Sequence, residues 1–402
     1  MVTPWLHIIG IGEDGEAGLT PAAMDQLRQA DVILGGDRHQ KLVCNTNAER
    51  LTWPSPFDAM IDTIIDHRGQ RFVILVTGDP LWYSVGARIA RAIDPSQIVF
   101  HPQLSAFQLA AARMGWSLAD CETLTVHGRP AEQIIPYFTA DARLLVLTKD
   151  ASTPAAIAGL LTEHGFGQSQ MTVLAALGGP NEQRVSASAG SWSQQVPDFH
   201  TLAIECRANA DATILPRGPG LPDSAFEHDG KMTKSEVRAV TLARLAPGRG
   251  EYLWDVGLGC GSVAIEWMRT GRDARAVGLE PKAERRAIAA RNAKRLGAPA
   301  LDIRDALAPD GLVDLPKPHA VFIGGGLTNE TFEICLQALR PHGRLVANAV
   351  TLETEALLLD LHARRGGELT RLAVSRAEPV GPYRGWRPSM PVTQLFLTKA
   401  GS

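Results

Sequence analysis

A proline- and glycine-rich stretch divides this chain into two parts, and strand and helix patterns alternate on both sides of it. Residues 216–222 read PRGPGLP, and this density of proline and glycine excludes a helix interior or a central strand. The chain has 402 residues, enough for two or three domains of about 100 to 200 residues each. We therefore expect two α/β domains, at residues 1–210 and 223–402, joined by a linker at 211–222.

Buried strands are expected where apolar runs end in glycine or polar residues. The first half contains HIIGIG, RFVILVTGDP, LTVHGR and RLLVLTKD, and the second contains EYLWDVG, ARAVGLE, HAVFIGGG and GRLVANAV. Helical patterns such as 282–296 and 329–339 separate the runs of the second half, which predicts a doubly wound sheet there. In such sheets, ligands bind at the carboxyl ends of the strands.

The composition excludes several classes of protein. Hydrophobic residues make up 45% and charged residues 21%, as in ordinary globular proteins. The 40 Lys and Arg against 43 Asp and Glu give no basic excess for general nucleic-acid binding. Apolar runs such as 73–76 and 144–147 are far shorter than the roughly 18 residues that cross a bilayer, and the N-terminus does not read as a signal peptide. We expect a cytoplasmic protein with no membrane segment.

Nothing in the cysteine and histidine pattern indicates a metal site. The cysteines show no paired spacing, and the 11 histidines include no HExxH pair. We therefore predict no bound metal and no disulfide framework, with the cysteines buried as small hydrophobic residues. These are Cys44, Cys121, Cys206, Cys260 and Cys335.

The first glycine loop, residues 10–15, has the GxGxxG spacing of a dinucleotide site, and Asp37 follows where a ribose-binding acid is expected. In a dinucleotide site the last glycine opens the helix, whereas here Thr20-Pro21 marks the helix start five residues later. Glu13 and Asp14 would also face the phosphates, at a cost of roughly 1 to 4 kcal/mol per contact. The loop therefore favours a cationic ligand, or is simply a tight turn.

Three further motifs accompany this loop, namely GDPLWYS, HPQLSAFQLAAARMG and AALGGPNEQRV. Together with GIGEDG, and in this order, they resemble the tetrapyrrole (corrin and porphyrin) methyltransferase family over about the first 208 residues. The family commonly has Pro-Gly where Glu13-Asp14 stand here. The resemblance implies an α/β tetrapyrrole-methylase fold and a bound S-adenosylmethionine. Its implied contacts are Gly10, Asp79, Ser105, Ala106, Leu177 and Gly178.

His127-Gly128-Arg129 follows a predicted strand at the expected edge of a sheet. An imidazole there can move protons and a guanidinium can bind a substrate carboxylate. The alternative is a hydrogen-bonded core histidine beside an exposed arginine. Decarboxylating members of the family that this half resembles carry the same HGR sequence, which favours a catalytic role for His127 and Arg129.

The second glycine loop, Asp255–Gly261, reads DVGLGCG between a predicted strand at 251–254 and a helix beginning near residue 262. We expect Gly257, Gly259 and Gly261 to approach a cofactor, and Glu280 at the end of the next strand to bind its ribose hydroxyls. Asp305 and Ala306, after a predicted strand at 301–303, resemble the adenine-side motif of Rossmann-like methyltransferases. Together these residues favour S-adenosylmethionine over NAD, although acidic residues also cap helices.

The segment MTKSEVR, residues 232–238, predicts a helix opened by a capping box of Thr233 and Glu236. With DVGLGCGS, GLEPKAERRA and FIGGG, it also resembles the decarboxylating precorrin methyltransferases over nearly the whole second half. The resemblance implies a Rossmann-like doubly wound sheet and a cofactor contact at Thr233. Lys234 and Arg238 become candidates for binding substrate carboxylates, or are surface charges.

A nucleic-acid methyltransferase is the runner-up hypothesis, because six basic residues lie on one predicted helix. A solvated helix face explains them equally well. The fourth strand ends in FIGGG, which offers no aromatic platform for a flipped base. The six residues are Lys282, Arg285, Arg286, Arg291, Lys294 and Arg295.

The order of the two halves resembles the fused precorrin methyltransferases of cobalamin biosynthesis. This implies one S-adenosylmethionine site per domain, a small-molecule tetrapyrrole substrate and a homo-oligomer. The first domain is expected to methylate carbon 5, and the second to methylate carbon 15 and to decarboxylate the acetate chain at position 12. The alternatives are a methyltransferase for another tetrapyrrole, an NAD-dependent oxidoreductase, and a tetrapyrrole carrier without turnover.

Overall fold

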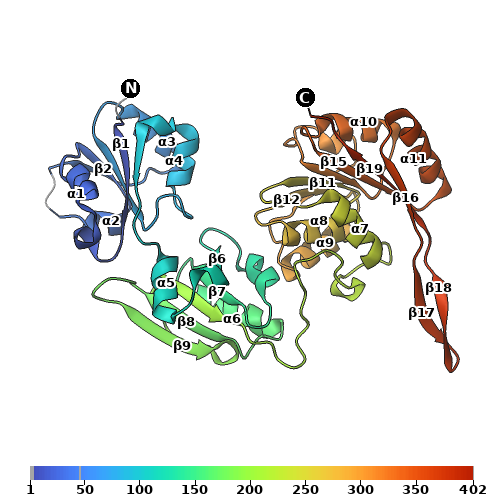
Figure 1. Ribbon diagram of the computed structural model, residues 1–402, viewed down its shortest axis with the longest axis horizontal. Helices are drawn as coiled ribbons and strands as arrows, with labels where there is room; N and C mark the ends of the chain where they lie inside the picture. Colours follow the sequence, from blue (N-terminus) through green and yellow to red (C-terminus); the bar gives the residue numbers. More distant parts are fainter. Residues whose placement is uncertain (1–3, 45–46, 402) are drawn as a thin grey trace. The chain divides into compact units, whose positions relative to one another are not determined.

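The computed structural model describes residues 4–44 and 47–401 and forms two compact units (Figure 1). Unit 1 contains the described residues up to Ala131 together with Thr139–Thr213, and unit 2 contains Glu132–Phe138 and the described residues from Ile214 onward. The proline- and glycine-rich stretch packs onto unit 2, because Leu221 is buried in its core and the Gly220 N–H donates to Glu266.

Unit 1 contains two five-stranded sheets, and the strands expected from the sequence are shared between them. The first sheet has the order β3-β2-β4-β1-β5 and is entirely parallel. Its strands are β1 (Leu6–Ile11), β2 (Val32–Leu34), β3 (Glu49–Leu51), β4 (Phe72–Thr77) and β5 (Ile98–His101).

The second sheet of unit 1 has the order β6-β7-β10-β8-β9 and is mixed. Only β6 and β7 run parallel, while the other neighbours are antiparallel. The HGR motif follows β6, which lies at an edge of this sheet as predicted. The strands are β6 (Cys121–Thr125), β7 (Arg143–Leu147), β8 (Gln170–Ala175), β9 (Gln183–Ser188) and β10 (His200–Glu205).

The helices of unit 1 begin where local capping groups are present. Thr20 caps α1 by accepting from the Ala23 N–H, which confirms the predicted helix start, and Ser105 forms a capping box with Gln108. The α-helices are α1 (Pro21–Arg28), α2 (Asp37–Lys41), α3 (Met60–Asp66), α4 (Gly86–Ala92), α5 (Ala106–Met114) and α6 (Thr153–Glu163). The 3₁₀ turns are η1 (Gly15–Gly18), η2 (Phe57–Ala59), η3 (Pro95–Gln97), η4 (Leu118–Asp120) and η6 (Ala189–Ser191).

Unit 2 is the doubly wound sheet that the sequence predicts. Its order is β13-β12-β11-β14-β15-β19-β16. The first five strands in this order are parallel to one another. Strand β19 is antiparallel to both of its neighbours, β15 and β16. The strands are β11 (Tyr252–Val256), β12 (Arg275–Leu279), β13 (Asp302–Arg304), β14 (Ala320–Ile323), β15 (Arg344–Ala349), β16 (Glu368–Leu372) and β19 (Val392–Thr398).

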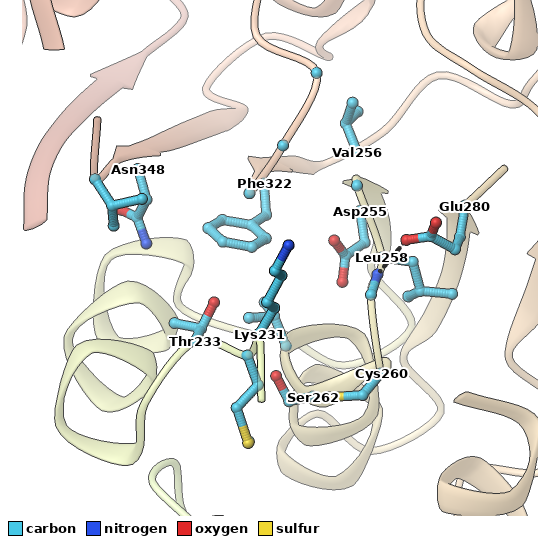
Figure 2. A pocket seen from close by; sticks show the side chains of 18 of the residues that line it. Lys231, Thr233, Asp255, Val256, Leu258, Cys260, Ser262, Glu280, Phe322 and Asn348 are labelled. Carbon is cyan, nitrogen blue, oxygen red and sulfur yellow. Dashed lines mark hydrogen bonds between the residues drawn. The ribbon is translucent and has the colours of Figure 1, made fainter. Parts of the chain in front are cut away.

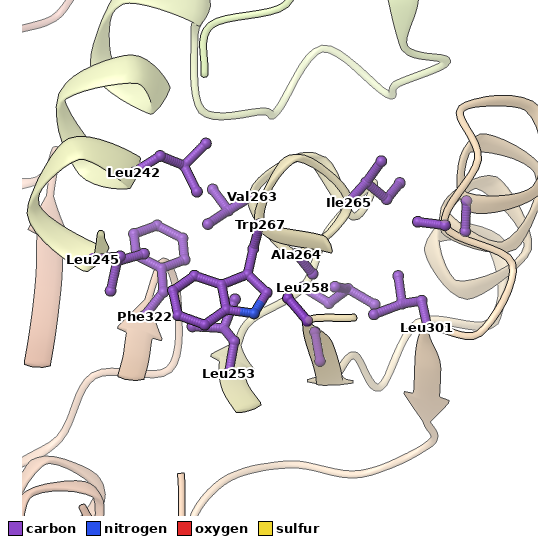
Figure 3. Close-up of a cluster of buried hydrophobic side chains, with 14 of the residues drawn as sticks. Leu242, Leu245, Leu253, Leu258, Val263, Ala264, Ile265, Trp267, Leu301 and Phe322 are labelled. Atoms are coloured by element: carbon purple, nitrogen blue, oxygen red, sulfur yellow. The ribbon is translucent and has the colours of Figure 1, made fainter. Parts of the chain in front are cut away.

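Helices cover both faces of this sheet, and each face has its own buried core. In one core the side chain of Trp267 is fully buried among Leu242, Leu253 and Phe322 (Figure 3), and its Nε1 donates to the Arg275 carbonyl. The helices are α7 (Ser235–Leu245), α8 (Ser262–Thr270), α9 (Ala283–Arg295), α10 (Asn329–Ala338), α11 (Leu352–Arg365), η5 (Ala131–Tyr137), η7 (Asp223–Ala225) and η8 (Asp310–Leu312).

A two-stranded hairpin of β17 (Ser375–Val380) and β18 (Tyr383–Pro388) extends away from the large sheet of unit 2 (Figure 1). Its large apolar side chains are exposed, including Tyr383 at 77% and Trp386 at 76%. A hairpin of this kind is at best marginally stable alone in water.

The cysteines are buried only in part as the sequence predicts. Cys206, Cys260 and Cys335 are buried as predicted, but Cys44 is exposed and Cys121 is only half-buried, so the prediction is wrong for those two. Among the helices of the described segments, none is long and apolar enough to span a bilayer.

Candidate functional sites

Unit 2 contains a cavity of about 890 Å³ at the carboxyl ends of β11, β12 and β14. The second glycine loop and the segment before α7 line it, and Figure 2 shows Lys231, Phe322 and Asn348 around the same space. The carboxyl end of the first strand of a doubly wound sheet is where such folds bind nucleotide-like cofactors.

The glycine loop keeps its backbone close to this cavity. Gly257 has a φ of +82°, and a Cβ there would lie 2.7 Å from the Gly325 N, so the loop tolerates no side chain at this position. Gly257 and Gly259 line the cavity. Gly261 does not line it; this residue, with a φ of +83°, is the N-cap of α8. The predicted loop is therefore present, with two of its three glycines at the site.

Glu280 is held in place at the end of β12 with its carboxylate facing the loop (Figure 2). Its Oε2 accepts from the Gly259 N–H at 3.0 Å and its Oε1 from the Lys282 N–H at 3.0 Å. The residue is only 4% exposed, yet it lines the cavity. Each carboxylate oxygen has a further lone pair, so the geometry suits hydroxyl donors such as those of a ribose.

Asp255, in β11, is the acidic group of the cavity that the sequence analysis did not select. Its Oδ2 accepts from the Ala264 N–H at 3.1 Å, whereas its Oδ1 has no hydrogen-bond partner among residues 4–44 and 47–401. Burial raises the pKa of this carboxyl to about 8. A cationic group supplied by a ligand would satisfy the unpartnered oxygen and stabilise the carboxylate. Its position in the sequence, two residues before the first glycine of the loop, could have identified it as a cavity residue.

The segment before α7 differs from its prediction. The N-cap of α7 is Lys234, with no side-chain cap, so the predicted capping box of Thr233 and Glu236 is wrong. Glu236 instead pairs with Arg376 at 2.6 Å, which comes from a distant part of the chain. Thr233 and Lys234 both line the cavity, and Lys234 lies 3.9 Å from Asp223.

Arg238 does not lie at the cavity, and the expectation that it binds a substrate carboxylate is corrected. Its side chain is fully buried, 2.5 Å from Glu266 and 3.4 Å from Asp223. It also donates to the Thr233 carbonyl at 2.5 Å and to the Leu221 carbonyl. These contacts occupy the donors of the guanidinium within unit 2, and they connect α7 to α8.

Of the adjacent residues Asp305 and Ala306, only one lies at the cavity. Ala306 lines the cavity, but Asp305 does not. The Asp305 carboxylate forms a two-point ion pair with Arg286 at 2.8 and 2.7 Å, and its side chain is 69% exposed. The Asp305 carboxylate keeps a further lone pair on each oxygen, but outside the cavity its expected adenine contact stays a prediction.

The basic residues of α9 pair with acidic residues. Arg285 makes a two-point contact with Asp229 at 2.8 and 2.7 Å, and Arg291 lies 2.8 Å from Glu227. These pairs offset part of the positive charge of the helix surface, in agreement with the solvated-face interpretation.

Unit 1 contains a second cavity, of about 880 Å³, that is lined by residues of both its sheets. The expected site residues that line it are Ser105, Ala106, His127, Arg129 and Leu177. His127 and Arg129 are exposed, so the alternative of a core histidine does not apply.

Three expected cofactor contacts of unit 1 lie outside the lining of the cavity. A Cβ on Gly10 would lie 1.8 Å from the Gly78 carbonyl oxygen, so Gly10 lets β1 and β4 approach. Asp79 accepts from the Leu81 N–H at 2.7 Å and shapes the turn after β4. The Gly178 N–H donates to Glu182 at 2.8 Å. None of the three residues lines the cavity, and Gly78 does so instead.

A charged cluster that no sequence motif revealed also lines the cavity of unit 1. Arg38 pairs with Glu13 and lies 4.0 Å from the centre of the Phe199 ring. Burial lowers the pKa of Arg38 to about 10. Burial and the adjacent Arg38 lower the pKa of His39 to about 4. The Glu13 carboxylate, which replaces the proline common in the family, is thus neutralised by a partner 25 residues away.

Comparisons with known proteins agree with this division. The family model for tetrapyrrole (corrin/porphyrin) methylases matches residues 5–191, and that for the precorrin methyltransferase domain matches residues 224–399. A protein of a Sinorhizobium species named precorrin-6Y C(5,15)-methyltransferase (decarboxylating) is 45% identical over 99% of this chain and 97% of its own length. The chain belongs to the precorrin-6Y C(5,15)-methyltransferase family.

A second protein of the same name matches nearly the whole chain, and a solved domain resembles the second part of it. The Mycobacterium tuberculosis protein (strain CDC 1551 / Oshkosh) of that name is 39% identical over 98% of this chain and 99% of its own length. The solved C-terminal domain of the Rhodobacter capsulatus enzyme is 48% identical, covers 46% of this chain and 100% of its own, and has a TM-score of 0.44.

Membership of the precorrin-6Y C(5,15)-methyltransferase family makes this chain an S-adenosylmethionine-dependent methyltransferase and sets aside the oxidoreductase and nucleic-acid alternatives. The residues of unit 2 fit this cofactor. Glu280 offers acceptors for a ribose, and Asp255 offers a buried oxygen without a partner for a cationic group. Gly257 and Gly259 leave room for close backbone contact.

Proposed function

We propose that this chain methylates carbons 5 and 15 of precorrin-6Y and decarboxylates the acetate chain at position 12, as a step of cobalamin biosynthesis. The observation that carries the proposal is the pair of separate cavities, one in each unit, in a chain that matches two-activity relatives along its whole length. Each cavity is large enough to hold a nucleoside and part of a macrocycle.

In unit 2 we propose that Glu280 binds the ribose, that Asp255 faces the cationic amino-acid end, and that Ala306 lies against the adenine. S-Adenosylmethionine supplies a methyl group bound to a positively charged sulfur. Lys234 at the cavity then contacts a substrate carboxylate, while Asp305, which is paired with Arg286, accepts from the adenine amine through a remaining lone pair. The enzyme's main task is to hold the methyl group and the attacking carbon in line.

Decarboxylation is assigned to the same cavity because its wall is partly apolar. Leu372, Val374 and Met390 line it beside the polar cofactor end. A carboxylate placed against such side chains is poorly solvated, which favours loss of carbon dioxide when the ring accepts the electron pair.

In unit 1 we propose that methylation of carbon 5 takes place. Ser105, Ala106 and Leu177 are placed against the cofactor, and Arg129 and His127 against the substrate. A precorrin carries several acetate and propionate groups, and a guanidinium binds a carboxylate through two parallel hydrogen bonds. Arg129 at the cavity offers such a partner.

We also propose that the chain forms a homo-oligomer through the β17–β18 hairpin. Tyr383, Trp386 and Met390 are exposed on or beside it, and aromatic residues of this kind are enriched in protein interfaces. A second copy of the chain presents the same surface, as the isologous contact of a twofold assembly requires.

The experiment that tests the proposed activity is mass spectrometry of precorrin-6Y after incubation with the full chain and S-adenosylmethionine. We expect a product that has gained two methyl groups and lost carbon dioxide. An unchanged macrocycle, from protein that binds S-adenosylhomocysteine, would contradict the substrate assignment.

A further inference from the structure

The two cavities differ in their histidines. His39, His127 and His200 line the cavity of unit 1, whereas no histidine lines the cavity of unit 2 within the described part of the chain. The proposed reaction of unit 1 releases a proton, whereas the two proposed reactions of unit 2 together release none, and the histidines follow this difference. The comparison rests on the function proposed above.

Methylation of a ring carbon that carries hydrogen releases one proton. The carbon–methyl bond forms with an electron pair of the ring, and the sulfur–methyl bond breaks with its pair passing to sulfur. The pair of the carbon–hydrogen bond then returns to the ring, and the proton leaves. Decarboxylation breaks the bond to the carboxylate carbon, leaves its pair with the macrocycle and consumes one proton. In unit 2 the two proton changes cancel, whereas in unit 1 the released proton needs an acceptor.

His39 cannot be that acceptor in its present contacts. Its Nε2 lies 3.1 Å from Nη2 of Arg38 and 2.9 Å from Oγ1 of Thr77. Because a guanidinium only donates, the lone pair of this Nε2 is already used. The hydrogen of the neutral ring is therefore on Nδ1, which cannot accept.

His200, the first residue of β10, has the opposite arrangement. Its Nδ1 lies 2.7 Å from the Pro197 carbonyl oxygen, and since a carbonyl only accepts, Nδ1 carries the hydrogen. Its Nε2 therefore has an unused lone pair, and this atom is buried without a hydrogen-bond partner within residues 4–44 and 47–401. The residue is 7% exposed.

Burial, and not the neighbouring charges, keeps this ring neutral near pH 7. Burial lowers the pKa of His200, and the nearby carboxylates of Asp198 and Asp150 oppose that shift only in part. Lys149, which lines the same cavity, is the cation of the neighbouring loop. A neutral imidazole with one unused lone pair is the form that a general base requires.

The fold places His200 beside the turn expected to hold the cofactor. In the sheet, His200 is paired with Ala175, the last residue of β8, and Leu177 follows two residues later. Thr148 fixes the other side by donating its Oγ1 to the His200 carbonyl at 2.7 Å. His200, Leu177 and Thr148 all line the cavity.

We propose that Nε2 of His200 accepts the proton released from the carbon methylated in unit 1. This assigns to His200 the proton transfer that the sequence suggested for His127. The exposed His127 and Arg129 are then left to contact the carboxylates of the substrate.

The test compares His200→Asn with His164→Asn and His127→Asn in the full chain. The side-chain amide introduced by His200→Asn can still donate to the Pro197 carbonyl but has no basic nitrogen. His164 makes a similar Nδ1 contact to the Leu160 carbonyl at 2.8 Å and does not line the cavity, so it is the matched control. We expect His200→Asn to slow the methylation assigned to unit 1 by about 10²- to 10⁴-fold, with decarboxylation and the other methylation unchanged.

Further readouts separate a proton acceptor from a structural residue. Nitrogen NMR of the wild-type chain at pH 7 should show a His200 ring with a protonated Nδ1 and an unprotonated Nε2, without any turnover. The wild-type rate of this methylation should fall as pH drops through the lowered pKa of His200. Imidazole added to His200→Ala should restore part of the rate, while the melting temperature and S-adenosylhomocysteine affinity of His200→Asn match those of the control.

Three results would overturn the inference. They are an unchanged rate in His200→Asn, a protonated Nε2 at pH 7, or a loss of this methylation in His127→Asn with His200→Asn active. A wild-type chain that leaves precorrin-6Y unchanged is a different result, because it overturns the proposed function on which the inference rests.

Discussion

At the scale of single residues, two buried glutamates of unit 2 differ in what neutralises them. Glu266 accepts from Arg238 at 2.5 Å and from the Gly220 and Leu221 N–H groups, so a buried guanidinium of the same unit neutralises its charge. Within residues 4–44 and 47–401, Glu280 accepts from two backbone N–H groups and has the Arg285 guanidinium at 4.0 Å. Glu266 is therefore structural, and Glu280 keeps acceptors for a ligand.

Glu280→Gln should weaken one cofactor site and leave the other intact. The amide replaces one acceptor oxygen with a donor that faces a backbone N–H, which costs about 1 to 3 kcal/mol. We expect the S-adenosylhomocysteine affinity of the unit 2 site to fall about 10- to 100-fold in calorimetric titration. Glu284→Gln, an exposed position of α9, is the control, and equal affinities for the two variants would refute the ribose role.

Arg238→Met should destabilise unit 2 without acting on the substrate. Removal of the guanidinium leaves Glu266 buried without its cation, and breaking a buried pair in this way costs about 3 to 5 kcal/mol. Arg238→Met with Glu266→Gln removes the unpaired charge but keeps an amide oxygen that can accept from a loop N–H, so it should recover part of the free energy of unfolding in urea. A stable Arg238→Met protein with a raised KM for the macrocycle would instead restore the substrate role.

The sequence predicted the position of a residue best where a recurrent supersecondary unit sets the place of its partner. Glu280 follows a strand and faces a loop 21 residues before it, a spacing set by one βαβ unit. Arg238 depends on Glu266, Asp223 and the fold of α7 on α8, and no local pattern contains that information. The Arg38–Glu13 pair was missed for the same reason.

At the scale of elements, close contacts of backbone decide where glycine is needed. Gly10 of β1 faces the Gly78 carbonyl at the end of β4, and Gly257 faces Gly325. Helix starts at Thr20 and Ser105 were predictable because their caps lie within three residues. The capping box of α7 was predicted wrongly, because the N-cap is Lys234 and Glu236 pairs with Arg376 of β17.

Gly10→Ala should destabilise unit 1. Its Cβ would overlap the Gly78 carbonyl, and overpacking of this kind costs about 3 kcal/mol. For a unit of about 200 residues, this lowers the melting temperature by about 6 to 12 °C. Gly159→Ala, in α6 with no atom near its Cβ, should be neutral or stabilising in the same calorimetric scan. Equal melting temperatures for the two variants would contradict the packing role of Gly10.

At the scale of the whole molecule, the chain carries two cavities of similar volume, one in each unit. Their surroundings suit different tasks. Histidines and a charged cluster line the cavity of unit 1, while a glycine loop, Glu280 and apolar side chains line that of unit 2. The sequence indicated both glycine loops, but not which side chains meet in each cavity, because those come from many separate strand ends.

The hairpin should determine the oligomeric state. Tyr383→Ser with Trp386→Ser removes two exposed aromatic side chains from its surface, so we expect a smaller species by light scattering after size exclusion. Phe57→Ser, an exposed aromatic of unit 1, is the control. An unchanged mass for the double variant would show that the hairpin is not the interface.

The most direct test of divided labour is product analysis by mass spectrometry with two variants of the full chain. Ala106→Trp fills the cavity of unit 1, and Gly259→Arg fills that of unit 2, because both residues line their cavities. We predict that Ala106→Trp yields a macrocycle with one added methyl group and without the carboxylate, and that Gly259→Arg adds no more than one methyl group and retains the carboxylate. Decarboxylation by Gly259→Arg, or two methyl transfers by either variant, would contradict the account.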